Sequence, residues 1–215
     1  MGHMTSAIPS FMRALGDVVL ALNQNLVKRE ASRTLTLLER QTLAMMHRLA
    51  YGFPAPFYDA HMQEDASTLG IVTSGGTLAN ITALWIARNS CFGPAGAFAG
   101  IEEAGVAAAL AHYHCRDAVI FGSRLMHYSF DKAAGILGFG ADNVKAVPVY
   151  RQGRISVRDL RRMIADSVSR RQRVMAIVGI AGTTDCGSID PLAEMADVAD
   201  EWNTRSPSRR WAWRR

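Results

Sequence analysis

The sequence lacks a long hydrophobic run. No stretch of about 18 apolar residues occurs, and the N-terminus has no basic segment followed by an apolar one. A membrane span and a signal peptide are therefore not expected. Cysteine is scarce as well, because Cys91, Cys115 and Cys186 are odd in number and widely spaced, which argues against a disulfide framework. Reduced thiols fit the cytoplasm, so we expect a cytoplasmic protein.

Acidic residues are fewer than basic ones, but the excess of positive charge lies in one place. The last eleven residues, RSPSRRWAWRR, hold five arginines and no acid. Removing these five from the 24 basic residues leaves 19, which equals the 19 acidic residues of the chain. The net charge of +5 therefore comes from the last eleven residues, and the rest of the chain is neutral. We expect no nucleic-acid partner and no membrane partner.

The N-terminal part of the chain has a helical pattern. Apolar side chains at helical spacing predict helices over 10–30 and 36–49, and Thr36 and Glu39 stand in capping-box spacing within the second. Hydrophobic residues make up 49% of the chain, enough for one large α/β domain or most of one.

Short apolar runs follow this helical part and alternate with further helical patterns. We expect strands at 69–73, 117–122, 143–149 and 174–182. These runs are apolar throughout, which is typical of strands covered by helices on both faces, so they predict a mostly parallel sheet. Ser156 and Asp159 again have capping-box spacing and predict a helix start.

A glycine turn, SGGTLAN at 74–80, lies between the first expected strand and a helical pattern at 81–89. Backbone N–H groups at a helix N-terminus bind phosphate, and glycine lets an anion approach closely. The alternative is that Gly75 and Gly76 only make a tight connection. The motifs of ATP-type phosphate loops and of dinucleotide-binding turns are both absent, so we expect a single phosphate on a smaller molecule.

Two further turns are expected at the same edge of the sheet. HYSFDKAAGILG at 127–138 follows one expected strand and begins a helix, and AGTTDCGSIDP at 181–191 follows another. Ligands of doubly wound sheets bind at the carboxyl ends of strands, so the three turns are expected to converge on one crevice.

The motifs TSGGTLANITAL, HYSFDKAA and AGTTDCGSIDPL, in this order, resemble the pyridoxal-phosphate-dependent group II amino-acid decarboxylases, which act on glutamate and aromatic amino acids. The first 30 residues are most similar to the subgroup of aspartate 1-decarboxylases. The resemblance runs from about residue 2 to residue 204. It implies an incomplete α/β large domain of fold type I, with a mostly parallel sheet and flanking helices. It also implies pyridoxal 5'-phosphate as cofactor, an amino-acid substrate and a homodimer.

The resemblance assigns roles to individual residues. Residues of the glycine turn would bind the cofactor phosphate, and they are Ser74, Gly75, Gly76 and Thr77. His127 would lie flat against the cofactor ring and act in catalysis, and Thr183 would contact the cofactor or its histidine neighbour. Asp190 is a weaker cofactor ligand, since an Asp before Pro also suits a helix N-cap. His3, Thr5 and Ser6 would line the substrate mouth, and no metal site is expected.

The reaction implied is removal of the α-carboxylate from an acidic amino acid, with aspartate to β-alanine favoured and glutamate next. The family's aspartate beside the cofactor ring nitrogen and its cofactor-binding lysine have no counterpart in this sequence. Lys28, Lys132 and Lys145 are the lysines present, and Lys132 matches a surface position on a helix. We therefore expect an inactive fragment, short at both ends.

Alternatives remain open for the chain as a whole. One is a non-catalytic truncated module that binds the cofactor weakly or pairs with a full-length subunit. Another is a lyase of the same cofactor fold that acts on a carbon–carbon bond. The expected division is a helical segment at 1–55, a partial cofactor-binding domain at 56–204 and an aberrant, frameshifted tail at 205–215. A basic arm whose tryptophans stack on bases is the other interpretation of that tail.

Overall fold

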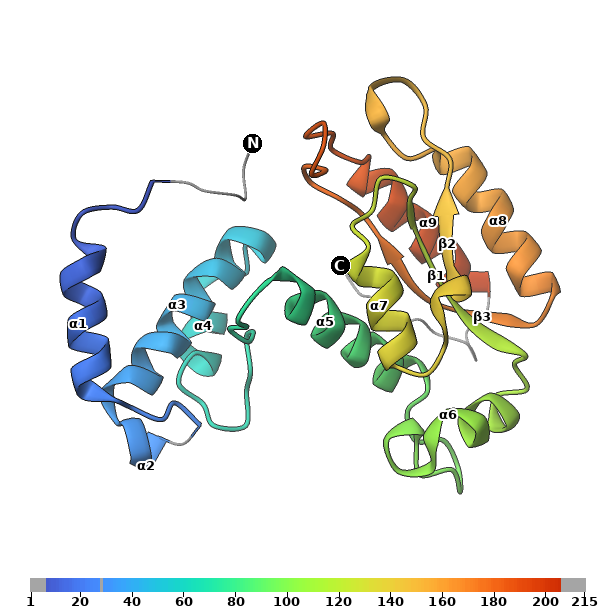
Figure 1. Cartoon of the computed structure of the whole chain (residues 1–215). Coiled ribbons are helices and arrows are strands. Elements are labelled where there is room, and N and C mark those ends of the chain that lie inside the picture. The colour runs from blue at the N-terminus through green and yellow to red at the C-terminus, as the bar shows by residue number, and fades with distance from the viewer. Residues whose placement is uncertain (1–6, 28, 206–215) are drawn as a thin grey trace. The chain divides into compact units, whose positions relative to one another are not determined.

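The computed structural model describes residues 7–27 and 29–205 (Figure 1). These residues divide between Ser74 and Gly75 into two compact units. No helix within the described ranges is both long and apolar enough to cross a membrane. The division expected from the sequence, at 1–55, 56–204 and 205–215, stays a prediction.

The first unit is helical, as the sequence predicts. Its helices are α1 (Met12–Leu22), α2 (Arg29–Ser32), α3 (Thr34–Tyr51) and α4 (Ala55–His61). The expected helix over 10–30 is interrupted, because α1 ends at Leu22 and its C-cap Asn23 takes a left-handed backbone conformation with φ of 43°. Arg29 and Arg40 both form ion pairs with Asp65 and fasten the segment after α4 to the helices before it.

The capping box expected at Thr36 and Glu39 is wrong. Helix α3 begins at Thr34, so Thr36 already lies inside it. The Thr36 side chain is buried and its hydroxyl bonds to the hydroxyl of Ser32, whose oxygen also accepts the Thr36 N–H at 3.1 Å. A serine of the preceding helix therefore accepts a backbone N–H of the first turn of α3.

The strand expected at 69–73 is also wrong, because these residues form no regular structure. Ile71 and Val72 are exposed, at 63% and 58%. A strand needs a neighbour for its backbone hydrogen bonds, and the described part of this unit contains no other strand. An apolar run of five residues cannot supply that neighbour by itself. The glycine turn consequently follows irregular chain rather than a strand.

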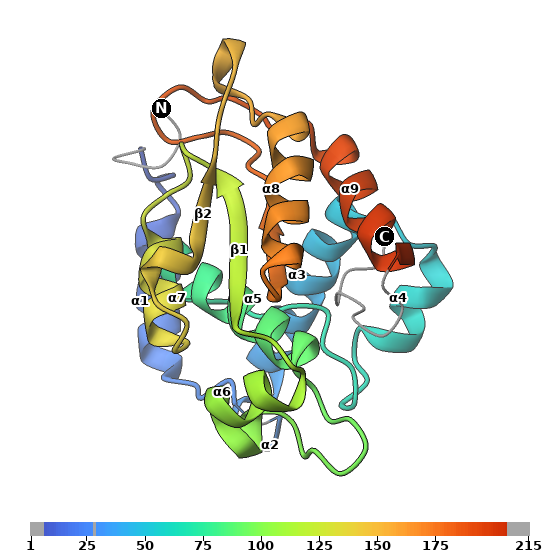
Figure 2. The same cartoon turned by 90° about the vertical axis from the view of Figure 1, so that its right-hand side faces the viewer.

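The second unit holds the sheet and the remaining described helices (Figure 2). In chain order its elements are α5 (Gly76–Cys91), α6 (Ile101–His112), β1 (Asp117–Ser123), α7 (Ser129–Ile136), β2 (Val144–Val147), α8 (Val157–Ser169), β3 (Gln172–Val178) and α9 (Leu192–Arg205), with short 3₁₀ turns η1 (Ala141–Asn143) and η2 (Arg151–Gly153). The sheet is 3-stranded, with order β2-β1-β3, and both pairings are parallel. The expected strands at 117–122, 143–149 and 174–182 are confirmed within a few residues.

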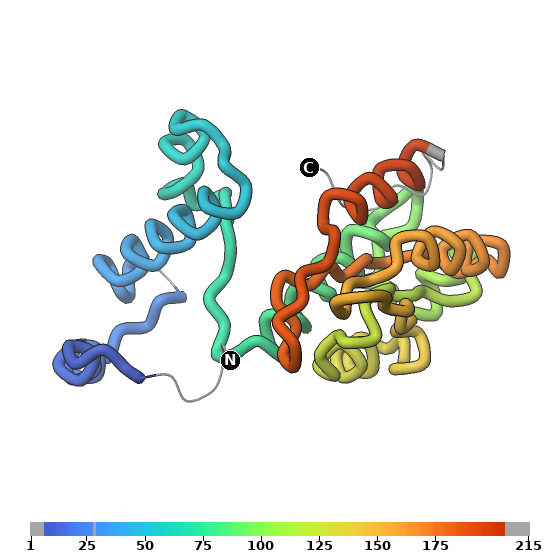
Figure 3. The backbone as a smooth tube through the Cα atoms, turned by 90° about the horizontal axis from the view of Figure 1, so that it is seen from above, coloured from blue at the N-terminus to red at the C-terminus, as the bar shows by residue number. Residues whose placement is uncertain are grey.

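Helices cover both faces of the sheet, which explains why β1 is apolar from Ala118 to Gly122. Ala118 and Ile120 of β1 pack against α5, α6 and α7, while Val119 and Phe121 pack against α8 and α9. Figure 2 shows α7 on one side of β1 and β2, with α8 and α9 on the other. The backbone tube in Figure 3 shows the same separation of α7 from α8 and α9. The expected mostly parallel sheet between two helical layers is confirmed.

The helix start expected at Ser156 is confirmed. Ser156 is the N-cap of α8, and its hydroxyl oxygen accepts the Asp159 N–H at 3.3 Å. The same hydroxyl donates to the Asp159 carboxylate at 2.7 Å. The α8 face behind this cap buries Leu160 and Ile164 against the sheet. A local sequence signal therefore fixes where the helix that covers β1 begins.

Candidate functional site

The glycine turn forms the N-terminus of α5. Gly75 is the N-cap, in extended conformation, and no side chain caps the helix. The first intrahelical bond runs from the Ala79 N–H to the Gly75 carbonyl, so the N–H groups of the first turn have no acceptor within the helix. A Cβ built at Gly75 or Gly76 would meet no atom within 4 Å. The first turn of α5 therefore has amide donors without an intrahelical acceptor, and the space beside its glycines is open, which fits an anionic group such as a phosphate.

The hydroxyl residues beside these glycines are exposed. Ser74 and Thr77 flank the turn, and both lie at the surface. Ser74 ends the first unit, whereas Thr77 belongs to the first turn of α5. Of the two hydroxyls, that of Thr77 is therefore placed on the same rigid helix as the amide donors.

His127 lies after β1, at the start of α7, and its side chain is exposed. Its Nδ1 accepts the Ser129 N–H at 3.2 Å, which leaves the proton of the neutral ring on Nε2. The His127 and Tyr128 rings are tilted, with centroids 4.2 Å apart. The start of α7 therefore fixes both the tautomer and the position of this imidazole.

A hydrogen bond joins the glycine turn to the histidine. Asn80, in the first turns of α5, donates from Nδ2 to the hydroxyl oxygen of buried Ser129 at 2.8 Å. Ser129 in turn holds the His127 ring through its backbone N–H. Helices α5 and α7 lie side by side in Figures 1 and 2. The structure thus brings the first two sequence-predicted turns together, through two residues for which the sequence predicts no role.

The third turn follows β3, the strand that pairs with β1 in parallel, so it opens at the same edge of the sheet as His127. Thr183 is buried in this turn, and its hydroxyl lies 2.8 Å from the Ser188 hydroxyl and accepts the Ser188 N–H at 3.1 Å. The Thr183 side chain therefore closes the turn on itself. Its expected contact with the cofactor stays a prediction.

Asp190 holds two loops together. Its carboxylate is buried and accepts the N–H of Ile155 at 2.9 Å and the N–H of Ile180 at 3.0 Å. Ile155 lies between β2 and α8 and Ile180 follows β3, so one side chain bridges the loops beyond the two outer strands of the sheet. These bonds run to other loops rather than to the first turn of α9. Asp190 is thus placed to position the carboxyl edge of the sheet.

Cys186 is exposed in the same turn. Its thiol is hydrogen-bonded to the hydroxyls of Thr183, at 3.1 Å, and Ser188, at 3.5 Å, and these bonds lower the pKa of Cys186. The exposed carboxylate of Asp185 acts in the opposite direction. Sequence reasoning contains no signal for this shift, because it depends on the folded turn.

The structure does not describe the residues expected at the substrate mouth. His3, Thr5 and Ser6 lie outside the described residues. Lys132 lies exposed on α7, with its ammonium 4.6 Å from the centre of the Tyr128 ring. This is the surface position on a helix that the sequence predicts for Lys132.

Comparison with known proteins gives concordant matches. A family model described as the pyridoxal-dependent decarboxylase conserved domain matches residues 2–205. Aspartate 1-decarboxylase of Aliivibrio fischeri is 50% identical over 199 residues, which are 93% of this chain and 36% of that protein. L-2,4-diaminobutyrate decarboxylase of Rhizobium meliloti is 35% identical over 201 residues, which are 94% of this chain and 34% of that protein. The chain spans about a third of the length of these relatives.

Solved structures share the fold. The glutamate decarboxylase domain of a diaminobutyrate-pyruvate transaminase and L-2,4-diaminobutyrate decarboxylase from Vibrio parahaemolyticus matches with a TM-score of 0.75 and 26% identity, over 94% of this chain and 40% of that one. Mouse CSAD matches with a TM-score of 0.75 and 24% identity, over 91% of this chain and 36% of that one. The expected partial large domain of fold type I is confirmed. With its three turns at the starts of α5 and α7 and after β3, the chain belongs to the group II family of pyridoxal-phosphate-dependent decarboxylases.

Proposed function

We propose that this chain is the phosphate-binding part of a pyridoxal-phosphate-dependent decarboxylase that converts aspartate to β-alanine. The observation that carries the proposal is the hydrogen-bonded connection from the uncapped N-terminus of α5 through Asn80 and Ser129 to His127. The 50% identity to an aspartate 1-decarboxylase favours aspartate over glutamate as the substrate.

Each part of the site has a role in binding. The amides of the first turn of α5, with the hydroxyls of Ser74 and Thr77, hold the phosphate, where the helix dipole favours negative charge. His127 lies against the cofactor ring, and its ring orientation is set by the Ser129 N–H. The hydroxyl pair of Thr183 and Ser188 keeps the third turn closed.

The cofactor, when bound, supplies an electron-accepting ring that draws the electron pair left by the departing carboxylate. The residues of this chain contribute orientation and charge. His127, with its proton on Nε2, offers a hydrogen-bond donor toward the reacting group. Asp190 keeps the loops at this edge in place through its two backbone bonds. His3, Thr5 and Ser6 are proposed to contact the substrate.

The 215-residue chain is proposed to lack turnover by itself. The resemblance calls for a lysine that holds the cofactor covalently, and Lys28, Lys132 and Lys145 do not match its place in the motif order. Binding of the phosphate end alone leaves the reacting group unaligned, and alignment supplies a large part of catalysis.

Pairing with a second subunit is favoured by one surface. Helix α1 has no buried residue and exposes Leu15, Val18, Val19 and Leu22, at 47%, 54%, 52% and 48%. Contiguous apolar side chains of this kind are typical of interaction surfaces. We propose that α1 contributes to a homodimer, or to pairing with a longer subunit of the same family.

Equilibrium dialysis with pyridoxal 5'-phosphate tests the proposal. We expect saturable binding that Gly76→Ala weakens by about tenfold, because a methyl group would occupy the space over the turn. Gly135→Ala on α7 is the matched control, since a Cβ there also meets no atom within 4 Å, and it should leave binding unchanged. Equal binding by both variants would contradict the phosphate site. Borohydride reduction followed by peptide mapping should give no adduct on Lys132, and CO2 release from aspartate should stay at background.

A further inference from the structure

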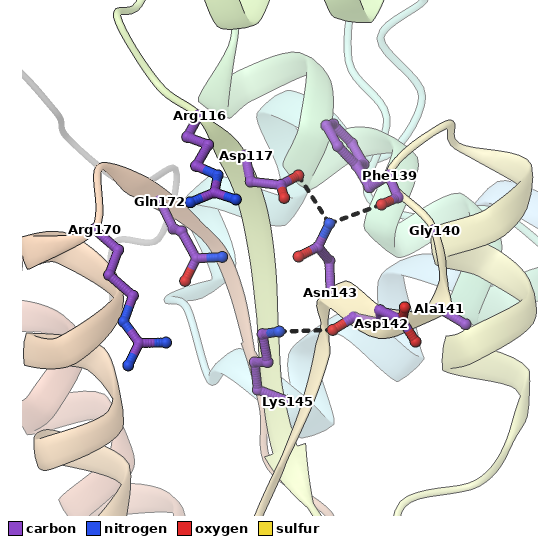
Figure 4. Close-up of a pocket in the computed structure, with 10 residues that line it drawn as sticks. All are labelled: Arg116, Asp117, Phe139, Gly140, Ala141, Asp142, Asn143, Lys145, Arg170 and Gln172. Atoms are coloured by element: carbon purple, nitrogen blue, oxygen red, sulfur yellow. Dashed lines mark hydrogen bonds between the residues drawn. The ribbon is translucent and has the colours of Figure 1, made fainter.

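A second site lies at the opposite edge of the sheet. A cavity of about 560 Å³ is lined by residues that precede β1, β2 and β3 and by the end of α8 (Figure 4). Strand β1 runs from this cavity, at Asp117, toward the edge that carries His127. Its 7 residues span roughly 20 Å, so the cavity is separate from the proposed phosphate site. Its volume falls within the range of small-molecule sites, about 300–1,000 Å³.

The cavity gathers positive charge from segments that are distant in sequence. Arg116 lies before β1, Lys145 lies in β2, and Arg170 ends α8. Figure 4 shows Arg116, Gln172 and Arg170 along one side of the space, with Asn143 and Lys145 across from them. The backbone bond from the Arg116 N–H to the Arg171 carbonyl, at 2.9 Å, brings the two arginine-bearing segments together.

The acidic side chains of the cavity form no ion pair with its two arginines. The Asp117 carboxylate accepts a bond from Asn143 Nδ2 at 2.8 Å, and the Lys145 ammonium donates to the Asp142 carbonyl at 2.6 Å. Within residues 7–27 and 29–205, no carboxylate lies within ion-pair distance of Arg116 or Arg170. The two guanidinium groups therefore remain available to an external anion.

Ordinary surface charge accounts for part of this arrangement. A basic side chain at the C-terminal end of a helix is favoured by the helix dipole, which explains Arg170 alone. It does not explain why Arg116 and Lys145 line the same space. Nor does it explain the buried amide of Asn143, whose Nδ2 also donates to the Phe139 carbonyl at 2.8 Å and is thereby held in place within the cavity wall.

We propose that this cavity binds a small molecule that carries an oxyanion group, either phosphate or carboxylate, between Arg116 and Arg170. Guanidinium groups bind both anions through paired N–H bonds. Asn143 and the carboxylates of Asp117 and Asp142 add hydrogen-bond acceptors, which suit hydroxyl or amino groups on the same ligand. The Lys145 ammonium adds a third positive charge to the lining.

Two probes separate the chemical sources of the anion. The ¹⁵N-labelled 215-residue chain is titrated with inorganic phosphate and, separately, with malonate, while backbone amide shifts are recorded. Saturable shifts at Gly140 and Asn143 support the proposal. A response to phosphate alone identifies a phosphate ester, and a response to malonate identifies a carboxylate. Phosphate binding at the α5 turn is read independently from the Gly76 amide.

Charge-removing variants assign the binding to the cavity. Arg116→Gln and Arg170→Gln should each weaken the Gly140 and Asn143 response by about tenfold, the loss expected for one charge-assisted hydrogen bond. Arg158→Gln is the matched control, because Arg158 is exposed on α8 outside the cavity. Absence of saturable shifts at Gly140 and Asn143 with either probe would overturn the proposal. Equal weakening by Arg158→Gln would also overturn it, since it would indicate only general screening of charge.

Discussion

Asn80 on α5 and Ser129 on α7 are 49 positions apart in the chain and are joined by a hydrogen bond of 2.8 Å. The bond connects helix α5, whose first-turn amides have no acceptor within the helix, to the helix that orients His127. It therefore holds the proposed phosphate site and the histidine together.

Replacing Asn80 should weaken the connection between α5 and α7. Asn80→Ala removes the donor to Ser129, and we expect a loss of about 1 kcal/mol in the free energy of unfolding. The affinity for the cofactor should fall as well, because the hydrogen bond that fixes α5 relative to α7 would be lost. Denaturant titration and equilibrium dialysis measure the two effects. Asn89→Ala, on the same helix but bonded to its neighbour Arg88, is the control. Unchanged cofactor affinity in Asn80→Ala would separate the histidine from the phosphate site.

We expect Asp190 to contribute to the stability of the fold rather than to contact the cofactor. Asp190→Ala leaves the buried N–H groups of Ile155 and Ile180 without their acceptor, which should cost about 2–4 kcal/mol. Asp190→Asn keeps one acceptor oxygen and should cost less. Thermal unfolding measures both, with exposed Asp185→Ala as the control. A variant that loses cofactor binding without losing stability would instead indicate direct contact between Asp190 and the cofactor.

The thiol of Cys186 should react at lower pH than an ordinary cysteine. Hydrogen bonds with Thr183 and Ser188 lower its pKa, so the thiolate is present at a lower pH than in a free thiol. Iodoacetamide labelling followed by mass spectrometry gives the rate at each pH. Thr183→Ala should move the midpoint of that profile upward, and Asp185→Asn should move it downward. A midpoint that Thr183→Ala leaves in place would contradict the hydrogen-bonded thiol. Buried Cys91, whose pKa is raised by burial, should label slowly throughout.

The cap of α8 gives a pH-dependent stability. Ser156→Ala should cost about 1 kcal/mol in urea unfolding at neutral pH, and Ser169→Ala, in the last turn of the same helix, should cost less. Bonds from Ser156 and Arg162 lower the pKa of the Asp159 carboxyl. A lowered folded-state pKa gives stability that is present above the unfolded pKa and is lost as pH falls through the folded value. The difference between wild type and Ser156→Ala should therefore shrink in acid. A difference that stays constant with pH would contradict this linkage.

The sequence predicts β1 and β3 because both strands are covered on two faces and therefore contain continuous apolar runs, 118–122 and 174–178. It predicts the start of α8 because Ser156 and Asp159 form a local cap. It fails at 69–73, where the described part of the helical unit offers no neighbouring strand, and at Thr36, whose N–H is accepted by the serine hydroxyl of another helix. The Asn80 to Ser129 bond and the cavity between Arg116 and Arg170 depend on residues brought together only by the tertiary fold. Spacing along the chain therefore carries no signal for either.

The central position of β1 between β2 and β3 has a consequence for how the molecule opens. From Ile120 to Gly122 both backbone edges of this strand are paired, and both of its faces are covered, so these amides are released only when a whole flanking layer separates. In deuterated water the exchange of Ile120 and Phe121 should be the slowest of the sheet. The segment that joins the two proposed sites would then be the last to become accessible to solvent.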